Sequence, residues 1–129
     1  MRHMTAYLIV FLGAGVGGVM RHAMNVWVAR VAGTHFPMHT FVINITGSLI
    51  MGLVTGWFIF KTDPGGHMRL FLATGILGGY TTFSTFSLDA VLLWERHEHL
   101  LAAYYVGGSV VLSVIGLVAG LWLMRTALG

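Results

Sequence analysis

The sequence predicts an all-α membrane protein with four transmembrane helices in a single domain, residues 1–129. Two observations lead to this fold class. Hydrophobic residues make up 57% of the chain and charged residues only 9%, far from the composition of a soluble domain. Charged residues are also missing from the intervals 31–60, 70–88 and 100–124, each long enough to cross the hydrocarbon core of a bilayer.

The four helices are expected at residues 5–31, 38–60, 69–94 and 100–126. The first contains an apolar stretch from Met4 to Met20 that is longer than the core of a signal peptide and lacks a clear cleavage site. The connections between the helices are short, so we expect no soluble domain or linker besides the bundle.

Composition also argues against several kinds of function. The absence of cysteine excludes disulfides, cysteine-ligated zinc and thiol chemistry. The seven Lys and Arg residues are scattered singly and form no basic stripe, so a pI near 9.8 does not indicate a nucleic-acid partner. No nucleophile–base pair or metal-binding constellation stands out in the sequence, so we do not expect an enzyme.

The insertion orientation is only weakly specified. With four spans, the cations at the helix ends divide between Arg2, Lys61, Arg69 and Arg125 on one side and Arg30 and Arg96 on the other. This is a small bias under the positive-inside rule, and it allows insertion in both orientations. The chain has no internal repeat, so any inverted symmetry has to come from pairing two chains in opposite orientations.

Small residues recur in three of the predicted helices. Gly52 and Gly56, like Gly116 and Gly120, are four residues apart, a spacing that lets helix backbones approach closely. We interpret most of these glycines as packing residues of a compact, oligomeric bundle.

The third predicted span contains an unusual polar stretch, Gly78 to Ser87, in which two adjacent glycines precede six hydroxyl-bearing residues. Backbone groups cannot stay unpaired against lipid, so a helix break at this depth has to face protein, water or an ion. We expect the glycines to break the helix here and the stretch to line a pore or a binding site.

Within this stretch, the triplet Thr82-Phe83-Ser84 is repeated as Thr85-Phe86-Ser87, which places like residues three positions apart on one helix. The edge of a phenyl ring carries partial positive charge, so two such edges flanked by hydroxyls can solvate an anion. The alternative is that both rings only pack against lipid or another helix. The interleaved hydroxyls favour the anion interpretation, because buried polar groups are costly without a partner.

Other spans supply further polar candidates. Asn44 lies in the middle of the second helix and offers amide donors, which makes it a pore candidate. Ser109 and Ser113 form an i,i+4 polar pair in the fourth helix. For all three, the alternative is an ordinary hydrogen bond between helices, worth about 0.6 kcal/mol on average.

Three charged or titratable features have open interpretations. Arg21 is the one strong cation inside a span, and it either reaches the membrane surface or faces an aqueous vestibule where it attracts anions. Asp89 follows the hydroxyl-rich stretch and can cap polar groups, face water at a pore mouth or carry protons. His97 and His99 lie with two glutamates in a short loop, where a solvated loop is favoured over a transition-metal site.

The segment from Gly75 to Ser87 resembles the signature of the Fluc (CrcB-type) fluoride channels. Shorter matches, Gly17 to Arg21, Thr40 to Asn44 with Gly47, and Tyr105 with Ser109, extend the resemblance over essentially the whole chain. The resemblance implies a dual-topology, antiparallel homodimer with two fluoride pores and a central sodium ion. It also implies a location in the inner cell membrane, where the channel lets fluoride leave the cell passively.

The resemblance further implies roles for individual residues. The pore residues would be Phe83, Phe86, Asn44, Ser84, Thr82, Tyr105, Ser109 and Ser113. Arg21 would lie in a vestibule, and the backbone carbonyls of Gly78 and Thr81 would bind Na⁺. Two positions depart from the family pattern. Asp89 stands where many relatives carry Glu, and Gly116 falls where some relatives continue the hydroxyl track.

Two rival functions are considered. A small proton-coupled four-helix transporter needs an acid in the first helix, and no acid lies between Met1 and Asp63. A non-conducting scaffold packed through its glycines would leave the polar break in the third span without a purpose. Fluoride conduction is therefore the favoured function.

Overall fold

The computed structural model describes residues 2–129, which are helical apart from short connections and a break at Thr81-Thr82. The first two spans are α1 (Arg2–Ala32) and α2 (Met38–Phe60). The third consists of the short elements η1 (Pro64–Gly66), α3 (His67–Arg69), η2 (Leu70–Leu77) and α4 (Gly78–Tyr80), followed by α5 (Phe83–Glu95). The fourth span is α6 (His99–Leu128). All four spans are long and apolar enough to cross a membrane, as the sequence predicts, and the chain is a multi-pass membrane protein.

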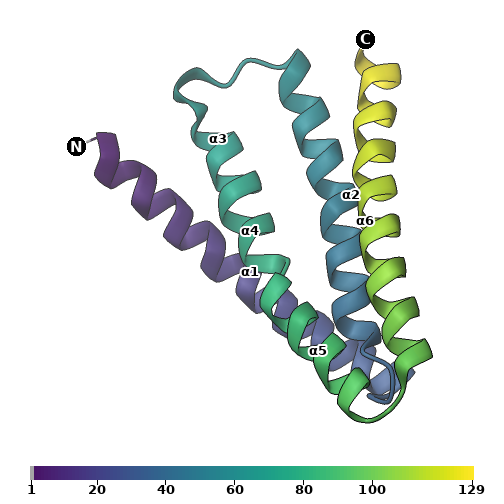
Figure 1. Ribbon diagram of the computed structural model, residues 1–129. Coiled ribbons are helices and arrows are strands. Elements are labelled where there is room, and N and C mark those ends of the chain that lie inside the picture. The colour runs from purple at the N-terminus through teal and green to yellow at the C-terminus, as the bar shows by residue number, and fades with distance from the viewer. Residues whose placement is uncertain (1) are drawn as a thin grey trace.

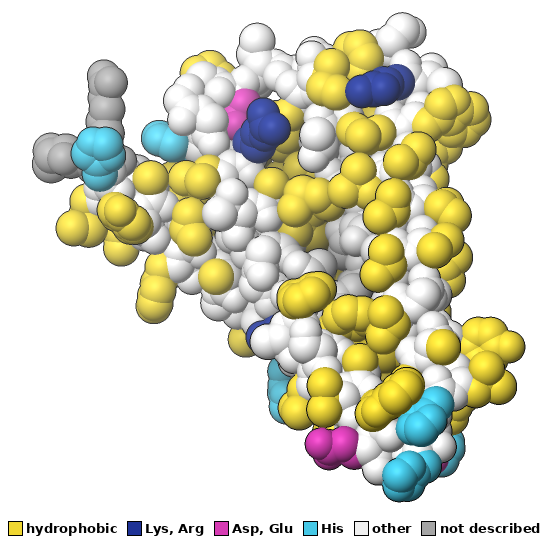
Figure 2. All heavy atoms as spheres, viewed as in Figure 1, with side chains coloured by type: hydrophobic (Ala, Val, Ile, Leu, Met, Phe, Trp, Pro, Cys, Tyr) yellow, Lys and Arg dark blue, Asp and Glu magenta, His cyan; other side chains and the backbone are white. Residues whose placement is uncertain are grey.

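The spans pair in two groups. α2 and α6 lie side by side along their length, while α1 packs against η2 and α4 (Figure 1). Both termini and the connection after α2 lie at one end of the molecule, and the α1–α2 and α5–α6 connections lie at the other (Figure 1). Hydrophobic side chains cover the length of the helices, whereas histidines lie near the ends of the molecule, several of them at the α5–α6 connection (Figure 2).

Glycines allow the close contact between α2 and α6. An added Cβ at Gly52 would collide with the carbonyl oxygen of Leu117, and one at Gly120 would lie 2.5 Å from the carbonyl oxygen of Leu49. A Cβ at Gly56 would lie 2.5 Å from the Cβ of Met124. These contacts confirm the packing role predicted for glycines, because helices this close leave no room for a side chain.

The third span is interrupted, but not at the glycines. Gly78 has helical dihedral angles (φ −63°, ψ −38°) and begins α4. The chain becomes extended only at Thr81 (φ −81°, ψ 158°) and Thr82 (φ −152°, ψ 123°). The prediction of a break at Gly78-Gly79 was therefore wrong by about three residues. Gly79 instead lets α4 approach α1, since an added Cβ there would lie 2.5 Å from the carbonyl oxygen of Ala14.

Candidate functional site

The break in the third span is held open by Asn44 of α2. Its side-chain Oδ1 accepts a hydrogen bond from the backbone N–H of Thr82 at 2.9 Å, and its Nδ2 donates to the carbonyl oxygen of Thr82, also at 2.9 Å. The amide therefore pairs with the extended backbone in the way a neighbouring strand would. This pairing satisfies the backbone N–H and C=O of Thr82, which lies outside the helices on either side of the break.

The same pairing releases a backbone carbonyl. In an uninterrupted helix, the N–H of Thr82 would close a turn onto the carbonyl oxygen of Gly78. That N–H is used by Asn44 instead. In the same way, the N–H of Thr85 donates to the hydroxyl of Thr82 at 3.2 Å rather than to the carbonyl of Thr81. The two carbonyls predicted to bind Na⁺, those of Gly78 and Thr81, are thus both deprived of their helical donors.

The start of α5 is rich in hydroxyl contacts. Thr82 is the N-cap residue, and its Oγ1 lies 3.3 Å from the hydroxyls of both Ser84 and Thr85. The hydroxyl of Thr81 turns the other way and donates to the carbonyl oxygen of Leu77 at 2.9 Å. N-terminal N–H groups of a helix give this end a partial positive charge. The local field at the start of α5 therefore favours an anion.

A groove of about 310 Å³ runs beside this helix start. Most of the predicted pore residues line it, from three helices: Asn44 of α2, Phe83 and Phe86 of α5, and Ser109 and Ser113 of α6, together with Thr82 at the break. Residues from spans far apart in the sequence are thus brought to one surface. Ser84 and Tyr105 are not among the lining residues of the groove.

The two phenylalanines differ in their surroundings. Their ring centroids are 5.5 Å apart with an interplanar angle of 46°. Phe83 is 78% exposed within the single chain, whereas Phe86 is half-buried and packs against the ring of Tyr105 at 5.2 Å. An exposed aromatic ring at a groove indicates a surface that a partner or a ligand covers.

Free donors remain in the groove. Ser109 is only 4% exposed, and its hydroxyl has no hydrogen-bond partner within residues 2–129. Asn44 uses Nδ2 for one hydrogen bond to Thr82, and an amide nitrogen carries two N–H groups. The groove therefore retains polar hydrogens to offer an ion.

Tyr105 acts at a distance from the groove. Its side chain is fully buried, and its hydroxyl donates to Oδ2 of Asp89 at 3.0 Å. Three roles were open for Asp89, and this hydrogen bond corresponds to the first of them, in which the carboxylate caps a polar group. The ring of Tyr105 packs against Phe86, which lines the groove.

Arg21 lines a second, polar cavity of about 250 Å³. Its other lining residues are Gly18, His22, Asn25, Thr40, Thr82 and Thr85. Thr82 lines both this cavity and the groove, so the two spaces meet at the residue that Asn44 holds. The vestibule position of Arg21 stays a prediction.

The histidine-rich loop has a different organisation. The ring of His99 stacks on Trp94 at 3.9 Å, and His97 packs edge-on against His99 at 5.9 Å. Within the described residues, no group of three or more His, Asp or Glu side chains lies together in a way that could hold a metal ion. The stacked aromatic arrangement gives the metal interpretation no support.

Sequence reasoning missed some of the site. It identified Asn44 as a hydrogen-bond donor to the ion, but not as the residue that binds the backbone of Thr82 at the break. It also named Thr40 only as part of the matched stretch up to Asn44 and gave it no role, whereas Thr40 lines the Arg21 cavity and lies four residues before Asn44 on the same face of α2. That spacing could have identified it.

Comparison with known proteins identifies the family. The family model described as "CrcB-like protein, Camphor Resistance (CrcB)" matches residues 8–121. A protein of Rhodopseudomonas palustris (strain BisB5) named "Fluoride-specific ion channel FluC" is 60% identical over 92% of this chain and 96% of its own length. A protein of Nitrobacter hamburgensis named "Fluoride-specific ion channel FluC 2" is 57% identical over the same shares. One of Agrobacterium fabrum, also named FluC, is 45% identical over 91% of this chain and 94% of its own.

These relatives carry the name of an ion channel, and this kinship confirms that the chain is not an enzyme. The matches extend over almost the full length of this chain and of each relative. The chain therefore belongs to the CrcB-type (Fluc) family that its third-span motif resembles.

Proposed function

We propose that this chain is a fluoride-selective channel that passively exports cytoplasmic fluoride and so lowers its toxicity. The observation that carries the proposal is the groove, which is lined by Asn44, Ser109 and the phenyl rings of Phe83 and Phe86. The channel names of the close relatives support the same function. Fluoride enters cells as HF and dissociates at cytoplasmic pH, so a passive pathway in the inner cell membrane lets it leave.

Fluoride needs replacement of its hydration shell. An unpaired small anion loses tens of kcal/mol of solvation in a low-dielectric medium. Asn44 and Ser109 offer N–H and O–H donors in the groove, and the phenyl edges offer partial positive charge. The helix start at α5 adds its dipole. Larger halides fit closely spaced donors less well, which gives selectivity for fluoride.

The functional unit in this proposal is an antiparallel homodimer with two pores. Phe83 is exposed beside the groove, and a Cβ at Gly78 would meet only one atom within 4 Å, 3.8 Å away. Both features leave room for a second copy at the break. The weak charge bias of the helix ends allows the two copies to insert in opposite orientations.

Such a dimer brings together the carbonyls of Gly78 and Thr81 from both copies. Their helical donors are used elsewhere, and four hard oxygens suit a hard cation. Sodium bound there would neutralise the converging carbonyl dipoles. In this proposal Asn44 and Thr82 hold the backbone open, so that the carbonyls remain available.

Fluoride efflux from liposomes tests the function. With a potassium ionophore present and equal pH on both sides, fluoride should leave rapidly while chloride stays behind. Efflux that requires an imposed proton gradient would instead support the alternative, a proton-coupled transporter that uses Asp89. Equal efflux of both halides would contradict selectivity.

Cysteine labelling tests the assembly. The chain has no native cysteine, so single cysteines placed near the N-terminus report only their own location. Labelling from both faces of the membrane is expected for dual topology. Labelling from one face alone would rule out the antiparallel dimer.

A further inference from the structure

The connection between α1 and α2, residues Gly33–Pro37, is held in place at both ends. Gly33 adopts a positive φ of 76° and its N–H donates to the carbonyl of Ala29, which ends α1. Pro37 is buried and precedes α2, where its carbonyl accepts from the N–H of Phe41 at 3.2 Å. Only three residues lie between these two, so the direction of the side chain of Phe36 is closely constrained.

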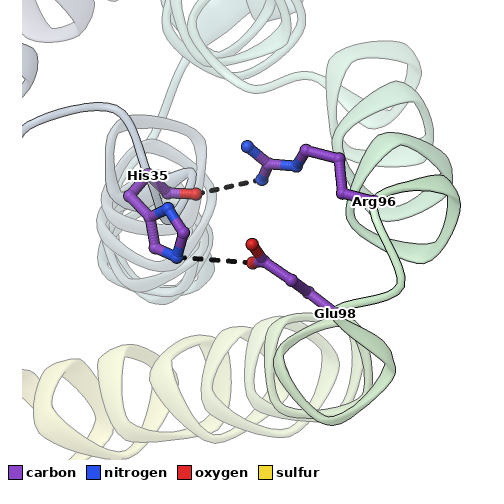
Figure 3. Close-up of polar contacts among 3 residues, drawn as sticks. All are labelled: His35, Arg96 and Glu98. Atoms are coloured by element: carbon purple, nitrogen blue, oxygen red, sulfur yellow. Dashed lines mark hydrogen bonds and ion pairs between the residues drawn. The ribbon is translucent and has the colours of Figure 1, made fainter.

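Two contacts from the α5–α6 turn hold this connection. The guanidinium of Arg96 donates to the carbonyl oxygen of His35 at 3.1 Å, and Nε2 of His35 lies 3.4 Å from Oε2 of Glu98 (Figure 3). Figure 3 shows both side chains reaching across to His35 from the chain that joins α5 to α6. The second contact is an ion pair only when His35 is protonated, and histidine changes charge between about pH 5 and 8.

Other charged or titratable groups flank the connection. Arg30 lies in the last turn of α1, His39 in the first turn of α2, and His97 between the two residues that contact His35. Within residues 2–129, no hydrogen bond or ion pair joins any of these three to His35. Glu98 is therefore the partner whose attraction to His35 depends on pH.

Phe36 transmits this restraint towards the groove. Its ring meets the ring of Tyr105 edge-on, with centroids 5.6 Å apart and an interplanar angle of 86°. Tyr105 also packs against Phe86, which in turn contacts Phe83. The hydroxyl of Tyr105 is fixed on Asp89. The ring of Tyr105 is thus held at its hydroxyl and packs against Phe36, Phe41 and Phe86 at once, so a shift of Phe36 changes the space in which Tyr105 lies beside Phe86.

We propose that Phe36 is a positioning residue for the ion pathway, held against Tyr105 by the contacts of His35 with Arg96 and Glu98. This inference rests on the proposed channel function, because Phe86 matters only if ions pass along the groove. Protonation of His35 strengthens the contact with Glu98, steadies Phe36 and keeps Phe86 in its place. The pathway is then more conductive at mildly acidic pH, the condition under which fluoride accumulates in cells as HF enters.

Fluoride efflux from liposomes, with the same pH on both sides and the leak of protein-free liposomes subtracted, tests the role of Phe36. Phe36→Leu should slow efflux between about twofold and tenfold, since an aromatic pair contributes a modest energy beyond its area. Phe36→Tyr keeps the ring and should stay near the parent rate. Phe36→Leu at the parent rate would overturn the proposal.

The role of His35 is tested by comparing efflux at about pH 6 and about pH 8. The parent should conduct about twofold faster at the lower pH, because an ion pair whose histidine side chain is 74% exposed has a small effect. His35→Gln should be slow at both values and His35→Lys fast at both. His67→Gln, a matched change in an exposed histidine at the opposite end, should follow the parent. An unchanged pH ratio in His35→Gln would contradict the account.

A measurement that does not depend on ion flux, the fluorine NMR resonance of a labelled Tyr105, separates this inference from the proposed function. The chain has four tyrosines, and incorporation of meta-fluorotyrosine gives each a fluorine resonance. The Tyr105 resonance, assigned with Tyr105→Phe, should move between the two pH values in the parent and not in His35→Gln. If the parent fails to conduct but this shift is seen, the channel function fails and the coupling stands. If the parent conducts and the resonance is unaffected by pH, the coupling is wrong.

Discussion

The two halves of the third span differ in their residues and in what those residues do. Before the break, glycines bring backbones together: Gly75 and Gly13 approach so closely that an added Cβ on either would lie within 3 Å of the other's Cα. After the break, Phe83 and Phe86 line the groove, Thr85 lines the Arg21 cavity, and Phe83 is left 78% exposed. The first half is an anchor on α1, and the second half is the surface that carries the proposed function.

The largest expected effect comes from damage to the anchor. An added Cβ at Gly17 would collide with the carbonyl oxygen of Ile76, which is backbone and cannot move aside. Gly17→Val should therefore abolish folded protein, because overpacking already costs about 1–3 kcal/mol where side chains can adjust. Gly15→Ala is the control, since a Cβ there has no atom within 4 Å. Size-exclusion chromatography measures both, and a monodisperse Gly17→Val protein would contradict the anchor.

Asn44, at the break between the two halves, should have a smaller effect on folding and a large effect on fluoride efflux. Asn44→Asp keeps an acceptor for the N–H of Thr82 but loses the donor to its carbonyl and adds a negative charge. We expect a loss of about 1–3 kcal/mol in the free energy of unfolding and no measurable fluoride efflux. Thermal unfolding and a fluoride electrode measure these quantities. Parent-like efflux would show that Asn44 neither holds the break nor meets the ion.

The smallest expected effect is a difference in fluoride efflux between alanine substitutions of two serines. Ser109 has a buried hydroxyl without a partner and lines the groove, whereas Ser84 is exposed and contacts Thr82 outside it. Ser109→Ala should leave stability unchanged, because no hydrogen bond within the chain is lost, and should slow fluoride efflux several-fold. Ser84→Ala should change neither property. If Ser84→Ala has the larger effect on efflux, the groove is not the pathway.

The sequence predicted the spans well, because length and the absence of charge are local properties. It placed the break at Gly78-Gly79, since glycine often interrupts helices, whereas the hydrogen bonds of Asn44, 38 residues away, put it at Thr82. The position of Tyr105 could not be predicted for the same reason, because its hydroxyl binds Asp89 on another helix. Composition showed which residues are polar, but only the fold decides which of them face one another.

The ring of Phe83 provides the most direct test of the claim that the second half of the third span carries ions. Phe83→Ile removes the electropositive edge with little change in volume, and the exposed position within the chain limits its cost to folding. The measurement is the initial rate of fluoride efflux from liposomes with matched amounts of folded protein. The account predicts a rate at least about tenfold below the parent, and a rate equal to the parent would contradict it.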